Sequence, residues 1–143
     1  MNVQSILEAK GNIVMSIGPT ATLQAAVHRL AEHRIGALLV LGPDHRVVGI
    51  VSERDVVRAL AERGPGVLDE PLSKVMTRTV VTCTRSDTIG DIMERMTTGK
   101  FRHVPVVEQE RLVGVVSIGD VVKQRLREME EESSALRDYI QTA

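Results

Sequence analysis

The amino-acid sequence predicts an α/β fold made of two strand-helix-strand-strand-helix units followed by a C-terminal helix. One supporting observation is an internal repeat: sliding the chain against itself by 66 residues places Ile13–Leu41 on Thr79–Val107, and about a dozen residues of the two units are identical. The other is the order of apolar runs and amphipathic segments, which is the same in both units. Because three strands cannot bury their own sheet, we expect the two units to pack face to face.

The first unit begins with a predicted strand at Ile13–Ile17. Thr22 then stands where an N-cap belongs, ahead of apolar residues at helical spacing. Two apolar runs separated by a polar turn, Ala37–Leu41 and Val47–Val51, have the spacing of a hairpin. The closing helix is predicted to start at Ser52.

The second unit repeats this order. Its strand is predicted at Val80–Cys83, its N-cap at Thr88 and its hairpin at Val104–Val107 and Leu112–Val116. Its closing helix is predicted to start at Ser117.

These elements divide the chain into four parts. A short lead-in helix is predicted ahead of each unit, at Val3–Leu7 and at Leu72–Met76, because the two segments resemble each other. A Gly-Pro-Gly segment marks the linker between the units. The predicted parts are residues 1–62 (first repeat with its lead-in helix), 63–71 (linker), 72–126 (second repeat) and 127–143 (helical tail).

The tail has a heptad pattern. Leu126, Met129, Leu136 and Ile140 are spaced alternately by three and four residues, with Ser133 at the missing step. We expect this seam to dock on another helix, either of this chain or of a partner.

The composition is that of an ordinary globular protein: 43% of the 143 residues are hydrophobic and 26% are charged. A net charge of -1 argues against a nucleic-acid partner. The longest wholly apolar run, Ala37–Leu41, is far shorter than the roughly 20 residues that span a bilayer. With one cysteine and no basic-then-apolar leader, we expect a cytoplasmic protein that does not enter a membrane.

No motif for bond-making chemistry is present. The four histidines are scattered, without the spacing of a metal site. Cys83 lies in an apolar run without a cationic neighbour, which favours a buried, inert thiol over a nucleophile. We therefore expect a protein that is not an enzyme and carries no metal or cofactor.

Two matched corners do have the features of a binding site. In each, an apolar strand runs into a Ser-x-x-Asp helix start, with Ser52 and Asp55 in one unit and Ser117 and Asp120 in the other. The free N–H groups and the helix dipole favour an anion such as phosphate, and the Asp can accept both hydroxyls of a ribose. The alternative is an ordinary N-cap.

The units differ next to these corners. Arg102 and His103 precede a strand in the second unit and would add positive charge for a phosphate, whereas Gly36 and Ala37 leave room for a base in the first. Alternatively, Arg102 and His103 are surface residues ahead of an edge strand that Pro105 protects.

At these residues the chain resembles a tandem pair of CBS (cystathionine β-synthase) domains, or Bateman module. The resemblance covers about residues 3–126 and rests on three segments: Gly49–Asp55, Arg102–Val107 and Gly114–Asp120. The chain is most similar to the stand-alone bacterial two-CBS proteins, including a C-terminal helix that ends like Leu136–Ile140.

The resemblance implies that the two repeats pack with pseudo-twofold symmetry. It also implies two clefts between the units that bind adenosine ligands: AMP, ADP, ATP, NAD or S-adenosylmethionine. Carried over to this chain, cleft one would be lined by Ser52, Arg54, Asp55, Thr79, Val81, Phe101, Arg102 and His103. Cleft two would be lined by Ser117, Gly119, Asp120, Lys10, Met15, Ile35, Gly36 and Ala37. Because cleft one gathers more cations, we expect it to prefer a phosphorylated ligand such as AMP and cleft two to bind more weakly or to take another ligand.

The leading hypothesis is thus a regulatory sensor that binds an adenosine ligand, forms a homodimer, and passes the occupancy of its clefts to a regulated protein by a conformational shift. The alternative is a constitutive dimeric assembly protein with vestigial clefts. The alternative predicts that no ligand alters stability and that Leu126→Glu abolishes the dimer.

Overall fold

The structure is a computed structural model that describes residues 1–11 and 15–142. Its helices are α1 (Val3–Lys10), α2 (Leu23–His33), α3 (Glu53–Arg63), α4 (Ile89–Gly99) and α5 (Ile118–Thr142). Its strands are β1 (Ser16–Ile17), β2 (Ala37–Leu41), β3 (Val47–Ser52), β4 (His103–Glu108) and β5 (Arg111–Ser117). The α/β fold class agrees with the prediction, and the order of the elements agrees apart from the strand predicted at Val80–Cys83.

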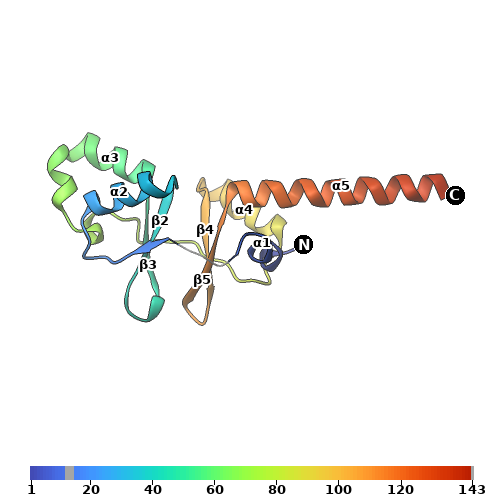
Figure 1. Ribbon diagram of the computed structural model, residues 1–143, viewed down its shortest axis with the longest axis horizontal. Coiled ribbons are helices and arrows are strands. Elements are labelled where there is room, and N and C mark those ends of the chain that lie inside the picture. The colour runs from blue at the N-terminus through green and yellow to red at the C-terminus, as the bar shows by residue number, and fades with distance from the viewer. Residues whose placement is uncertain (12–14, 143) are drawn as a thin grey trace.

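Each unit is built on an antiparallel hairpin, β2–β3 in one and β4–β5 in the other. β1 extends the first hairpin by pairing in parallel with β2. The two hairpins stand side by side (Figure 1), and a bridge between Arg46 and Arg111 joins them. An ion pair of 2.8 Å from Arg46 Nη1 to Glu110 Oε2 adds to this junction.

The strand predicted at Val80–Cys83 is reduced to a single parallel bridge between Cys83 and Val106. The Cys83 N–H donates to Pro105 O, and the Val107 N–H donates to Cys83 O, both at 2.9 Å. The next bond of a parallel ladder would need the N–H of residue 105, which proline lacks. The second sheet therefore has two strands among the described residues instead of the predicted three. In the first unit, part of the strand predicted at Ile13–Ile17 lies outside the described residues.

The helix starts follow the predicted caps. Thr22 and Thr88 each accept a hydrogen bond from the backbone N–H three residues later, at 3.2 and 3.1 Å. Ser52 caps α3 in the same way, through a 3.3 Å bond from the Asp55 N–H. Capping bonds of this kind stabilise a helix by about 1 kcal/mol each.

The lead-in segments pack on the opposite units. Val3, Ile6 and Leu7 of α1 lie in the core of the second unit, whereas Leu72 and Met76 lie in the core of the first. The second lead-in segment is a short 3-10 turn rather than an α-helix. This exchange ties the two units together, because each core is completed by a segment that precedes the other unit in the chain.

Helix α5 runs without interruption through residues 126 and 127, where the sequence suggested the end of the second repeat. Its first part packs on α4 and α1, and the rest extends beyond the body of the molecule (Figure 1).

Candidate functional site

A cavity of about 650 Å³ lies where the two units meet. Its wall contains every residue that the sequence assigned to cleft one: Ser52, Arg54, Asp55, Thr79, Val81, Phe101, Arg102 and His103. These residues come from the start of α3, from the segment before α4 and from the segment that leads into β4. The fold thus brings together side chains that are widely separated in the sequence, in a space of the size of a small-molecule site.

Asp55 is fixed by the start of α3. Its Oδ2 accepts hydrogen bonds from the Ser52 N–H at 2.8 Å and from the Ser52 hydroxyl at 3.0 Å. Its Oδ1 accepts a bond from the Thr77 hydroxyl at 3.2 Å. The carboxylate is therefore both a cap of α3 and part of the cavity wall.

Thr77 is a cavity residue that sequence reasoning missed. An antiparallel bridge between Ile50 and Thr77 places it there, with bonds of 3.0 and 2.9 Å in the two directions. Gly49 permits this approach, because a Cβ at that position would lie 3.0 Å from the Thr77 carbonyl oxygen. The available signal was Gly49 itself, which the second unit repeats at Gly114. The other lining residues that were missed are Ile50, Glu53, Val80, Gly99 and Lys100.

The charges around the cavity are unequal. Arg54, Lys100 and Arg102 supply three positive side chains, against the two carboxylates of Glu53 and Asp55. Lys100 caps the C-terminus of α4 in the left-handed conformation, with φ of 58°. The net positive wall suits an anionic group such as a phosphate.

His103 forms part of the cavity wall. Burial lowers its pKa below the ordinary value, and the nearby Lys10 ammonium lowers it further. The ring also lies beside Gly36, because a Cβ on that glycine would be 3.6 Å from the His103 Cε1. His103 therefore links the cavity with the region around Lys10 and Asp120.

The residues assigned to cleft two are arranged differently. Lys10 Nζ lies 2.7 Å from Asp120 Oδ2 and donates a second bond of 3.0 Å to Val115 O. The Asp120 Oδ2 also accepts the Ser117 N–H at 2.9 Å. Burial by itself would raise the pKa of Asp120, but the bonds from Lys10 and Ser117 outweigh it and hold that pKa below the ordinary value. The carboxylate that was predicted to hold a ribose is thus occupied by a lysine of the same chain.

The remaining residues assigned to cleft two are dispersed. Gly36 and Ala37 lie on the wall of the cavity that contains Asp55. Met15 and Ile35 are partly buried against the core of the first unit. Gly119 is exposed in the first turn of α5, close to the Ser117 hydroxyl.

Cys83 is buried as predicted, at 2% exposure. Burial raises the pKa of its thiol to about 12, and the nearby Asp87 carboxylate adds to the shift.

In the part of the chain that the structure describes, no helix combines the length and the apolarity needed to span a membrane.

Comparison with known proteins decides the family. The family model described as "CBS domain" matches residues 11–62 and 72–127, one match in each unit. The chain belongs to the CBS domain family. Members with paired domains such as this one are generally regulatory rather than catalytic.

Curated relatives of this CBS pair include an uncharacterised 17.7 kDa protein of Acidianus ambivalens, 35% identical over 79% of this chain and 68% of the relative. The mitochondrial CBS domain-containing protein CBSX3 of Arabidopsis thaliana is 34% identical over 84% of this chain. The chain spans 60% of CBSX3 and 21% of a further Arabidopsis relative, so some relatives are much longer.

Solved structures share the fold. A CBS-domain containing protein of Agrobacterium tumefaciens is 45% identical, with a TM-score of 0.84 over 87% of this chain and 99% of that one. The CBS domain pair of protein MJ0100 has a TM-score of 0.79 over 90% of this chain and 98% of that one, at 23% identity.

Proposed function

We propose that the protein is a nucleotide-sensing regulatory module that binds an adenosine ligand in the cavity next to Asp55. The observation that carries this proposal is the cavity itself, in which one helix N-terminus with its carboxylate faces the basic segment before β4. In this arrangement Asp55 accepts the ribose hydroxyls, and the aliphatic wall of Ile50 and Val80 receives the adenine.

Among adenosine ligands, the charges favour AMP. Arg54, Lys100 and Arg102 can neutralise a phosphate, and the positive end of the α3 dipole adds to the attraction. ADP, ATP, NAD and S-adenosylmethionine are the other candidates. The related MJ0100 domain pair was crystallised with 5'-methylthioadenosine and S-adenosyl-L-methionine, which supports the adenosine part of the proposal.

Regulation requires that a ligand in the cavity changes the surface that the module presents to a partner protein. We expect the bound ligand to shift the relative arrangement of the two units, because the cavity is lined by both. The module acts as a homodimer in the cytoplasm, without catalysis of its own.

A panel of ligands tests the proposal. Thermal unfolding is measured on the full chain with AMP, ADP, ATP, NAD or S-adenosylmethionine, after any co-purified nucleotide has been extracted and identified. A ligand at a hundred times its Kd stabilises the fold by about 2.7 kcal/mol, so AMP should raise the Tm by several degrees.

The matched variants are Asp55→Asn and Asp120→Asn, which remove the same capping carboxylate from α3 and α5. The increase in Tm should be lost in Asp55→Asn and kept in Asp120→Asn. If no ligand raises the Tm of the extracted protein, the sensor function is refuted and the constitutive assembly protein becomes the better account, since the exposed seam of α5 already favours an assembly role.

A further inference from the structure

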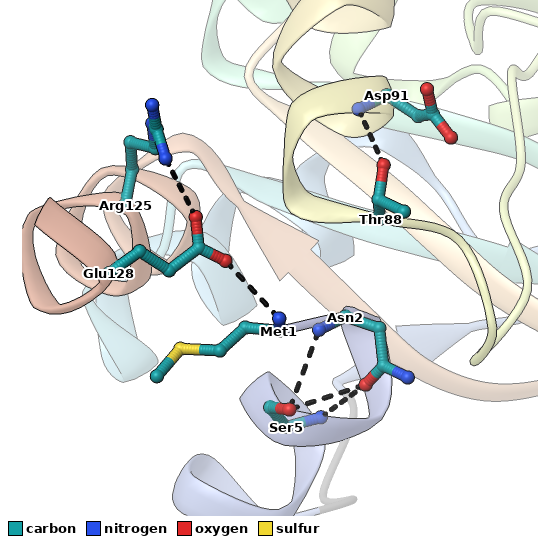
Figure 2. Close-up of polar contacts among 7 residues, drawn as sticks. All are labelled: Met1, Asn2, Ser5, Thr88, Asp91, Arg125 and Glu128. Carbon is teal, nitrogen blue, oxygen red and sulfur yellow. Dashed lines mark hydrogen bonds and ion pairs between the residues drawn. The ribbon is translucent and has the colours of Figure 1, made fainter. Parts of the chain in front are cut away.

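The outer half of α5 lacks support from its own chain. Val121 and Gln124 are the buried residues of this helix, and every described residue after Glu128 is exposed. Figure 2 shows where the helix leaves the body: Glu128 Oε1 lies 3.4 Å from the Met1 nitrogen, and Glu128 Oε2 accepts a 3.0 Å bond from Arg125. A helix of this length without packing is marginal in water, so its stability requires a partner.

The exposed residues form an apolar seam. In heptad letters, Leu126, Ser133 and Ile140 take position a, whereas Val122, Met129 and Leu136 take position d. The apolar members are between 45% and 66% exposed. Beyond the first turn of α5, the residues that are buried or half-buried are 121, 124, 125 and 128, which leaves the a and d positions exposed.

The flanking charges identify the occupant of this seam. In a parallel pair of α5 helices, position g faces position e of the next heptad of the partner. Arg125 then faces the partner's Glu130, and Glu132 faces the partner's Arg137. By twofold symmetry each attraction occurs twice.

The antiparallel pairing brings like charges together. Pairing position a with position d across the seam places Leu126 opposite the partner's Leu136. Lys123 would then face the partner's Arg137, and Glu130 and Glu132 would each face their own copy. Charges of the same sign at these positions disfavour the arrangement.

We propose that a second copy of this chain covers the seam, with the two α5 helices in a parallel, in-register two-stranded coiled coil. Ser133 meets the partner's Ser133 at the central a position, so that in this register the polar residues of the seam lie opposite each other and the apolar residues pair with apolar residues. This proposal deepens the homodimer of the proposed function and does not depend on the nucleotide cavity.

Sedimentation equilibrium of the full chain tests both the surface and its orientation. The wild-type protein should be a dimer, and Leu136→Glu should convert it to a monomer. Arg137→Glu should weaken dimerisation about tenfold, because two attractions with Glu132 become repulsions. The double variant Glu132→Arg/Arg137→Glu should restore the wild-type Kd, and Arg127→Glu, the same charge change at the outward b position, should leave the Kd within about twofold.

Three results would overturn the proposal. A monomeric wild-type protein would refute it together with the homodimer. A dimer that Leu136→Glu leaves intact would locate the contact on another surface. Tighter association of Arg137→Glu would show the antiparallel arrangement, in which the carboxylate introduced by this substitution attracts the partner's Lys123. If AMP still raises the Tm of monomeric Leu136→Glu, the nucleotide site does not depend on the dimer, and the two proposals can be tested independently.

Discussion

Asp55 shows how one residue can serve stability and binding together. Its Oδ2 closes the capping box with Ser52, while its Oδ1 is held by Thr77 on the wall of the cavity. The cap orients the carboxylate before any ligand arrives, which reduces the entropy lost on binding. Asp120 has the same cap but a different second partner, the Lys10 ammonium.

His103 makes a pH-dependent contribution to stability. Its pKa is lowered mainly by burial, so the unfolded chain binds this proton more tightly than the folded one. The contribution is complete above the unfolded pKa of about 6.5 and is lost as pH falls through the lower folded pKa. The charged groups around the ring are Lys10, Asp120, Arg102 and Glu53.

We therefore expect the free energy of unfolding of the wild-type protein to decrease below about pH 6.5. His103→Gln should flatten this decrease, whereas His28→Gln, which removes an exposed imidazole from α2, should not. Urea denaturation at a series of pH values measures the effect. Parallel curves for the wild-type protein and His103→Gln would show that the imidazole makes no such contribution.

Between elements, the close contact at Gly49 joins β3 to the segment that leads into the second unit. A Cβ there would lie 2.9 Å from Met76 Cγ and 3.0 Å from Thr77 O, and the latter is a backbone atom that cannot rotate away. The corresponding Gly114 lies against Leu7 of α1. These two glycines allow the exchanged lead-in segments to reach the opposite units.

Gly49→Ala should therefore destabilise the protein by about 1–3 kcal/mol through overpacking, and should weaken AMP binding by displacing Thr77. Gly66→Ala is the control, because no atom lies within 4 Å of its added Cβ. Urea denaturation gives the stability and calorimetry the affinity. An unchanged stability for Gly49→Ala would mean that β3 and the Thr77 segment can separate without cost.

The elements also show what could be predicted from the sequence. The repeat and the apolar runs predicted both hairpins and four helix starts, because these depend on local pattern and capping. Other features depend on contacts distant in the chain. The loss of strand structure at Val80–Cys83 follows from Pro105 on the neighbouring strand. The resemblance placed Lys10 and Asp120 in the same cleft, but the direct bond between these residues, 110 apart in the chain, was not predicted. Residue spacing does not contain this information.

For the whole molecule, the main consequence is that Asp55 and Asp120 have different surroundings. The family resemblance predicted the residues of cleft one, which the fold collects around a single cavity. In the other half, a ribose would have to displace Lys10 from Asp120, at the expense of a charge-assisted bond of 2.7 Å. We therefore propose that Asp55, whose partners are neutral groups, receives a ligand more readily than Asp120, whose partners include the Lys10 ammonium.

Calorimetric titration of the nucleotide-free 143-residue chain with AMP tests this account most directly. We predict one strong site per chain, an affinity at least about tenfold weaker in Asp55→Ala because ribose bonds to a carboxylate are lost, and an Asp120→Ala affinity within about twofold of wild type. The titrations are run well below the Tm, since each variant also loses a cap. AMP binding that Asp55→Ala leaves unchanged, or two equal sites per chain, would contradict the account.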